Sequence, residues 1–173
     1  RAGLENAINL IDSSPDKVIS DLEILTVLMA SRQGTININE LNINTVLKTN
    51  ANFDRLLAAL NRFANNTGTI SDQEAFETIL DLRQANVSDA TLDRALFLGF
   101  NKHAEAINHS VQLFDSHADG QITDSEFVSV IMQMRSNELP ADENQIVLDI
   151  LNNIPKYKNI KDIIVALDTS NNG

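Results

Sequence analysis

The sequence contains no cysteine, and this absence excludes several kinds of chemistry. Without thiols the chain forms no disulfide, holds no metal through thiolate and has no cysteine nucleophile. A reducing compartment suits such a chain, so we expect a cytoplasmic protein. The sequence begins at Arg1 rather than at Met, so we also expect a trimmed start that carries no readable targeting signal.

Basic residues are scarce in the chain. Lys and Arg number 13 against 24 Asp and Glu, which gives a formal net charge of −11. Because a nucleic-acid-binding surface must neutralise phosphates, this balance argues against nucleic acid as a partner. No apolar run approaches the roughly 20 residues of a membrane-spanning helix, so we expect no membrane span. An acidic surface suits cations or a basic protein partner.

The residue patterns of common catalytic sites are also missing. The three histidines, His103, His109 and His117, are not spaced as a metal-binding pair on one face of a helix. No Ser-His-acid arrangement, phosphate-cradling glycine loop or paired-carboxylate signature stands out. We therefore expect a protein that is not an enzyme.

Apolar residues recur at intervals of three and four through most of the sequence, which is the period of an amphipathic helix. One clear stripe consists of Phe53, Leu56, Leu57, Leu60 and Phe63. Breaks rich in Asn, Ser and Gly separate this stripe from its neighbours. The pattern predicts an all-α protein of about eight to ten short helices.

The most informative stretch runs from Phe114 to Phe127 and reads Phe-Asp-Ser-His-Ala-Asp-Gly-Gln-Ile-Thr-Asp-Ser-Glu-Phe. It has polar side chains at alternate positions, a glycine in the middle and a glutamate near its end. Calcium takes about six to eight oxygen ligands, so a short loop that binds it must turn inward at alternate residues and close with a bidentate carboxylate. Gly120 would supply the sharp turn that such a loop needs.

This stretch resembles the calcium loop of the EF-hand family, a helix–loop–helix unit, with Asp115 at its first position and Glu126 at its last. The resemblance implies a calcium ion held by Asp115, His117, Asp119, the carbonyl of Gln121, Thr123 and Glu126. His117 departs from the family pattern, which has Asp or Asn there, and imidazole nitrogen is a poor ligand for calcium. The resemblance therefore implies either a water in the place of His117 or a weak site.

Residues 29–40 and 63–74 repeat one another 34 residues apart. Both share the ending Gly-x-Ile-x-x-x-Glu with residues 115–126, but both are one residue shorter before the glycine and lack an acid there. We interpret them as degenerate loops that cannot gather the oxygens calcium needs. Residues 152–159, followed by Ile160, are interpreted as a fourth and also degenerate unit.

The four units together resemble the two-lobed, calmodulin-like arrangement of paired EF-hands. They predict an N-terminal lobe of residues 1–86 with two degenerate units, and a C-terminal lobe of residues 87–173 with one near-consensus and one degenerate unit. An extra linker helix is expected near residues 92–100. Because EF-hands pair through a short two-stranded contact at the loop isoleucine, the resemblance implies the pairs Ile36 with Ile70 and Ile122 with Ile160.

We therefore expect a calcium-binding adaptor in which one site, at residues 115–126, regulates a lobe that binds a protein partner. The alternative is a calcium-independent structural or interaction module that retains the fold only. With three methionines in the chain, a fixed lobe that grips one amphipathic helix fits better than a promiscuous groove. Acidic residues within 115–126 repel one another without a cation, so we expect the C-terminal lobe to respond to calcium and the N-terminal lobe to fold without metal.

Overall fold

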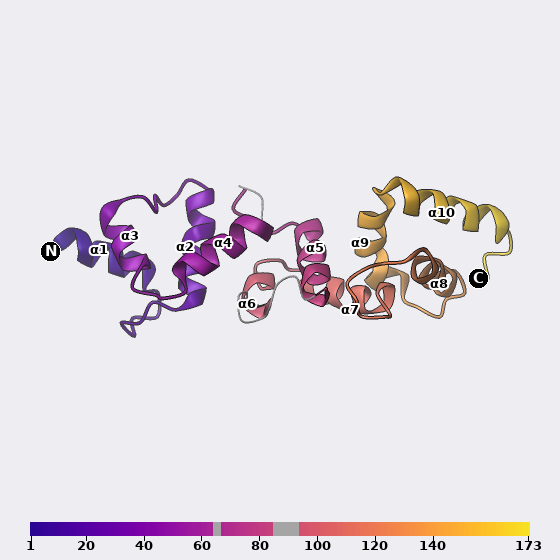
Figure 1. Ribbon diagram of the computed structural model, residues 1–173, viewed down its shortest axis with the longest axis horizontal. Helices are drawn as coiled ribbons and strands as arrows, with labels where there is room; N and C mark the ends of the chain where they lie inside the picture. The colour runs from indigo at the N-terminus through magenta and orange to yellow at the C-terminus, as the bar shows by residue number, and fades with distance from the viewer. Residues whose placement is uncertain (64–66, 85–93) are drawn as a thin grey trace. The chain divides into compact units, whose positions relative to one another are not determined.

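The computed structural model describes residues 1–63, 67–84 and 94–173, and these residues form helices joined by turns, without a strand (Figure 1). The helices are α1 (Ala2–Ile11), α2 (Asp21–Arg32), α3 (Leu41–Leu47), α4 (Phe53–Phe63), α5 (Asp72–Arg83), α6 (Arg94–Leu98), α7 (Ala104–Phe114), α8 (Asp124–Arg135), α9 (Ala141–Asn152) and α10 (Pro155–Leu167). The predicted all-α class is confirmed. Within these residues, no helix combines the length and the hydropathy needed to cross a bilayer.

Polar residues in the first turn determine where several helices begin. Ser20 caps α2 and Thr123 caps α8, and the glutamate three residues later, Glu23 or Glu126, completes a capping box in each case. Pro155 occupies the first turn of α10, where a missing N–H costs nothing because that position has no intrahelical partner. These local signals place the helix starts that frame the loops.

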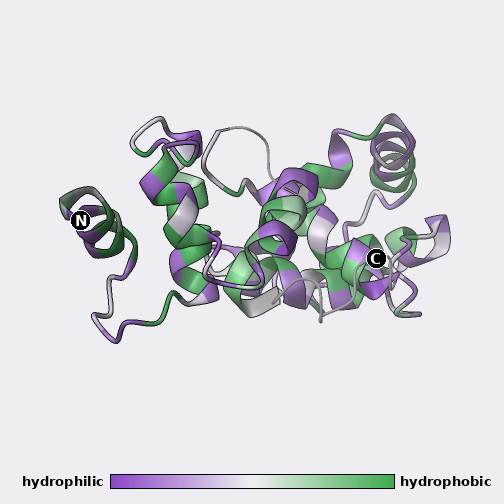
Figure 2. Ribbon diagram, turned by 60° about the vertical axis from the view of Figure 1, so that its left-hand side comes forward, coloured by the Kyte–Doolittle hydropathy of each residue, from purple (hydrophilic) through white to green (hydrophobic). Residues whose placement is uncertain are grey.

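The helices group by their contacts into two units. The first unit contains α1 to α4 and α6, with α2 packed against α4 and α1 against α3. Figure 2 shows hydrophobic and hydrophilic residues sharing the surface of individual helices, as expected where each helix buries one face. The fully buried core of this unit includes Ile24, Leu25, Leu28, Leu47, Leu56 and Leu60.

The second unit contains α5 and α7 to α10. In it α7 packs against α5 and α9, and α8 packs against α10. Three aromatic rings connect these helices, because the ring centroid of Phe127 lies 6.2 Å from that of Phe114 and 4.8 Å from that of Tyr157. The loop from Asp115 to Glu126 therefore begins and ends beside this aromatic cluster.

This grouping differs from the predicted lobes in the place of α5. The predicted boundary between residues 86 and 87 lies outside the described residues, but α5, expected in the first lobe, belongs to the second unit. The physical reason is that α5 packs against α7, and that Arg83 and Gln84, at the end of α5 and just after it, bond to the loop that follows α7. Helix α6 lies within the range expected for the extra linker helix and belongs to the first unit.

The fourth loop predicted at residues 152–159 is wrong. Helix α9 ends at Asn152 and α10 already begins at Pro155, with a short corner between them (Figure 1). Ile160 therefore lies inside α10 and cannot make a two-stranded contact with Ile122; instead the Tyr157 hydroxyl donates to the Ile122 carbonyl at 2.5 Å. Ile36 and Ile70, the other predicted pair, also lie outside any strand.

The helices recur with a period of about 52 residues rather than 34. Each repeat has a first helix, then a loop, then a second helix, as in α1 and α2, α4 and α5, or α7 and α8. The second helices of this repeat, α2, α5 and α8, begin 51 and 52 residues apart, each just after Ile-Ser or Ile-Thr. The first helices, α1, α4, α7 and α10, end 52, 51 and 53 residues apart. The predicted 34-residue repeat instead pairs Met29, near the end of the second helix α2, with Phe63, at the end of the first helix α4. It therefore aligns helices that have different places in the structural repeat. Accordingly Glu40 makes no capping hydrogen bond and is exposed, whereas Glu74 is buried.

Candidate functional site

The loop between α7 and α8 is built on the buried carboxylate of Asp115, the residue that caps the C-terminal end of α7. Its side chain is fully buried. One oxygen, Oδ1, accepts the backbone N–H of Asp119 at 3.1 Å, and the other, Oδ2, accepts that of Gly120 at 2.9 Å. Asp115 therefore closes the first half of the loop by hydrogen bonding to its backbone.

A cation from another helix is already bound to this carboxylate. Arg83, at the end of α5, donates from Nε to Asp115 Oδ2 at 2.5 Å and from its terminal nitrogen to the Asp115 carbonyl at 2.8 Å. This two-point contact uses the planar fork of the guanidinium. The first predicted ligand position thus carries a buried ion pair.

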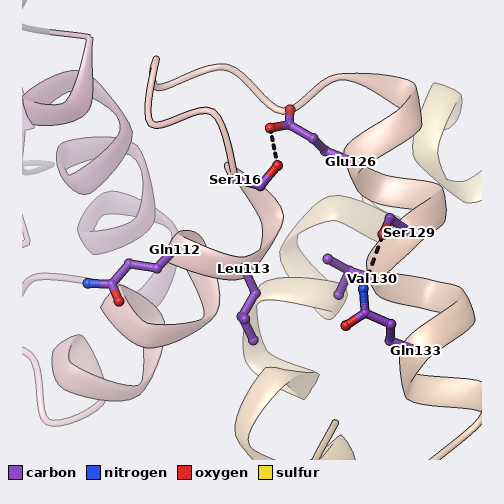
Figure 3. A pocket seen from close by; sticks show the side chains of 7 residues that line it. All are labelled: Gln112, Leu113, Ser116, Glu126, Ser129, Val130 and Gln133. Atoms are coloured by element: carbon purple, nitrogen blue, oxygen red, sulfur yellow. Dashed lines mark hydrogen bonds between the residues drawn. The ribbon is translucent and has the colours of Figure 1, made fainter. Parts of the chain in front are cut away.

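The second half of the loop is closed by Glu126, whose side chain turns back from α8 toward Ser116 (Figure 3). Its Oε2 accepts the backbone N–H and the hydroxyl of Thr123, both at 2.9 Å. Its Oε1 accepts the Ser116 hydroxyl at 2.9 Å and the His117 backbone N–H at 3.0 Å. Burial alone would raise the pKa of Glu126, but the hydrogen bonds from Thr123 and His117 outweigh it and hold the pKa well below its ordinary value.

His117 points to Glu126. Its ring nitrogen Nδ1 lies 2.7 Å from Glu126 Oε1, while its side chain remains 73% exposed. The hydrogen bond and the negative charge of Glu126 raise the pKa of His117, which favours the imidazolium form. At the third loop position the chain thus has an imidazole that bonds to Glu126 instead of an oxygen ligand.

The remaining predicted ligands serve the turn itself. The Asp119 carboxylate accepts the backbone N–H of Gln121 at 2.9 Å and is exposed. Thr123 is the cap of α8, since its hydroxyl oxygen accepts the N–H of Glu126. The six predicted residues therefore form two hydrogen-bonded clusters, one around Asp115 and one around Glu126.

This arrangement does not fit a calcium ion. Calcium needs about six to eight oxygens directed at one point, whereas Asp115 and Glu126 direct both of their oxygens at internal donors. Across the part of the chain that the structure describes, no group of three or more His, Asp or Glu side chains is placed to hold a metal ion. The loop keeps the sequence spacing of a calcium loop but has a different bonding pattern.

The sequence analysis missed an equivalent loop, residues 12–23, between α1 and α2. Glu23 Oε1 accepts the backbone N–H of Ser13 at 2.7 Å and that of Ser14 at 3.1 Å, while Oε2 accepts the N–H of Ser20 at 2.9 Å. Hydrogen bonds from Ser20, and then from Ser14 and Ser13, lower the pKa of Glu23 to about 2. The available signal was Ile-(Ser or Thr)-Asp-x-Glu, which occurs at residues 19–23, 70–74 and 122–126.

The glycine of the loop motif is absent from this first loop, which is why it was overlooked. Lys17 stands in its place and adopts the same left-handed backbone, with φ of 66° against 73° at Gly120. Asp12 corresponds to Asp115, since its Oδ2 accepts the N–H of Lys17 at 3.1 Å. A search for the glycine therefore finds residues 63–74 and 115–126 and passes over residues 12–23.

Comparison with known proteins adds no family assignment to this description. Protein-family models, curated proteins and solved structures were searched, and none of them matched the chain.

Proposed function

We propose that this chain is a calcium-independent interaction module, made of helix–loop–helix repeats whose loops are closed by their own side chains. The observation that carries the proposal is the ion pair of Arg83 with the buried Asp115, together with the internal donors that surround Glu126. A metal ion would have to displace all of these contacts. Of the two functions expected from the sequence, the one that retains the fold without the metal agrees better with this bonding.

Binding of a protein partner is supported by an apolar surface on α10. Ile163 is 59% exposed and Leu167 is 79% exposed. A separate groove of about 260 Å³ lies between α8, α9 and α10, lined by side chains that include Ile131, Met134, Leu148 and Val165. The net charge of −11 favours a basic partner, so the proposed ligand is a basic amphipathic helix.

Calorimetric titration of the full chain with calcium tests the proposal. We expect no saturable heat up to millimolar calcium, and the same trace for the variant Glu126→Gln. A one-site isotherm in the wild type that disappears in Glu126→Gln would contradict the proposal. It would favour instead the calcium-binding adaptor first expected from the sequence, because the bidentate glutamate is the ligand that such a site cannot lose.

A further inference from the structure

Each second helix of the repeat ends at an arginine, and each of these arginines contacts the end of the next first helix. Arg83 binds Asp115, as described above, and Arg135 binds Asp168 in the same manner. The Nε of Arg135 lies 2.7 Å from Asp168 Oδ2, and its terminal nitrogen lies 2.8 Å from the Asp168 carbonyl. Arg32 donates to the Asn61 side chain at 2.5 Å. The two-point contact of an arginine with an aspartate thus occurs twice, whereas Arg32 bonds to an amide within α4.

The backbone of the loop also packs closely on the last turn of the preceding second helix. A Cβ placed on Gly120 would lie 2.5 Å from the Leu80 carbonyl oxygen, and one on Gly68 would lie 2.8 Å from that of Met29. The Gln84 side chain donates to the Gly120 carbonyl, and the Gln33 side chain donates to that of Gly68. The loops around Gly68 and Gly120 are therefore each bound to the end of the second helix of the preceding repeat through a glutamine side chain. The loop around Gly120 is bound through Arg83 as well.

The loop at residues 12–23 differs from these two loops. In the described part of the chain Asp12 accepts from the Ser14 hydroxyl and from the Lys17 backbone N–H, and no lysine or arginine side chain pairs with it. At this loop Lys17 stands in the place of the glycine, with a positive φ and an exposed side chain. The glycine and the arginine thus occur together, where a helix end must approach the loop.

We propose that the Arg83 guanidinium is the resident cation of the loop at residues 115–126, and that it joins α5 to this loop in place of a metal ion. The inference rests on the calcium-independent function proposed above and deepens it. The guanidinium neutralises the one fully buried carboxylate of the loop and satisfies its carbonyl at the same time. Removing one partner of such a buried pair leaves an uncompensated charge, whereas removing both does not.

The test measures thermal unfolding of the full chain and three variants: Arg83→Gln, Asp115→Asn and the double variant. Tyr157 is the only tyrosine, the chain has no tryptophan, and the ring is buried in the second unit, so its fluorescence reports that unit. Arg83→Gln should lower the midpoint by about 10 °C or more. The double variant should lose less than the sum of the two single variants, because the pair acts as one interaction.

The second part of the test repeats the thermal unfolding in the presence of calcium. With the guanidinium removed, millimolar calcium should raise the midpoint of Arg83→Gln by about 5 °C, because it supplies the missing positive charge. It should leave the wild type unchanged. Lys158→Gln is the matched control, since it removes one positive charge from an exposed pair with Asp162 and should respond in neither part of the test.

Each outcome has one meaning. Additive losses in the cycle, or an Arg83→Gln variant that calcium does not stabilise, would overturn the resident-cation proposal while leaving the proposed function intact. A wild type stabilised by calcium would instead overturn the proposed function. If Arg83→Gln does not fold, the cycle of Arg135→Gln with Asp168→Asn tests the same contact at the next loop, where additivity would likewise refute it.

Discussion

Glu23 and Glu126 show, at the scale of single residues, how one side chain can close a loop of ten or more residues. Each sits in the first turn of a second helix, completes a capping box with a hydroxyl residue, and accepts backbone N–H groups from the start of its loop. Bonds to a charged acceptor are about twice as strong as neutral ones. The two glutamates therefore stabilise the loops without any ligand.

The depressed pKa of Glu23 predicts a specific dependence of stability on pH. A carboxylate whose pKa is lower in the folded state stabilises the fold above its unfolded value of 4.5, and this stability is lost as the pH falls toward its folded value of about 2. We expect Glu23→Gln to cost about 2 kcal/mol at neutral pH, since several bonds to a charged group are weakened. Thermal unfolding between pH 7 and pH 2 should show this difference shrinking below pH 4.5.

Glu40 provides the control for this measurement. It is the glutamate of the 34-residue sequence repeat, but it is exposed and makes no capping bond, so Glu40→Gln should change stability little at any pH. Equal losses in the two variants would mean that the structural repeat does not distinguish the stabilising glutamates.

At the scale of elements, α10 differs from the other first helices. Its apolar stripe resembles theirs in sequence, yet Ile164 is buried while Leu167 is largely exposed. The equivalent residues Ile11 and Phe114, at the ends of α1 and α7, are buried, and the Phe114 ring stacks on Phe127 of the second helix α8. The apolar end of α10 is thus a surface where another helix could pack.

We predict that this surface binds a basic amphipathic helix. The probe is a fluorescent synthetic helix of Leu and Lys, and the measurement is its anisotropy in chelator and in calcium. The double variant Ile163→Ser with Leu167→Ser should weaken binding about tenfold, with little loss of stability, because both side chains are exposed. Affinity should be the same in both buffers.

A leucine of equal exposure in the first unit serves as the control. Leu41 is 79% exposed on α3, so Leu41→Ser should leave the anisotropy curve unchanged. A loss of binding in Leu41→Ser as large as in the α10 variant would show that the peptide binds through charge or general hydrophobicity, and not at α10.

At the scale of the whole molecule, the two units should behave alike toward calcium. The sequence predicted that the C-terminal half would respond and the N-terminal half would not, on the basis of carboxylate repulsion within residues 115–126. In the structure the buried carboxylate there is paired with Arg83, and Glu126 is surrounded by donors. The repulsion that calcium was expected to relieve is already reduced by these contacts.

Amide hydrogen exchange of the full chain with and without calcium measures this directly. We expect unchanged protection over residues 20–80 and over residues 105–165. Protection that rises with calcium over residues 105–165 alone would contradict this expectation and restore the first one. The most protected amides in either condition should lie in the helices that carry the buried cores, α2 and α4 in one unit and α7 and α8 in the other.

Sequence periodicity by itself determined that the protein is all-α, and local motifs determined several helix limits. Thr123 with Glu126 at the start of α8 and Pro155 at the start of α10 are such local signals, because caps and proline act through bonds within a few residues. The sequence analysis nevertheless interpreted the first two as calcium ligands and Pro155 as part of a fourth loop. It did predict residues 115–126 as a loop between two helices. Such features need no knowledge of the rest of the chain.

The tertiary structure alone decided that the carboxylate of Asp115 is paired with a cation. Asp115 meets Arg83 across 32 residues of sequence, a distance at which no helical or turn period relates two positions. The same holds for α5, whose place in the second unit depends on contacts at its C-terminal end with residues after α7. A motif specifies the spacing of its side chains, but their partners depend on which helix end packs beside them, and packing is a property of the folded chain.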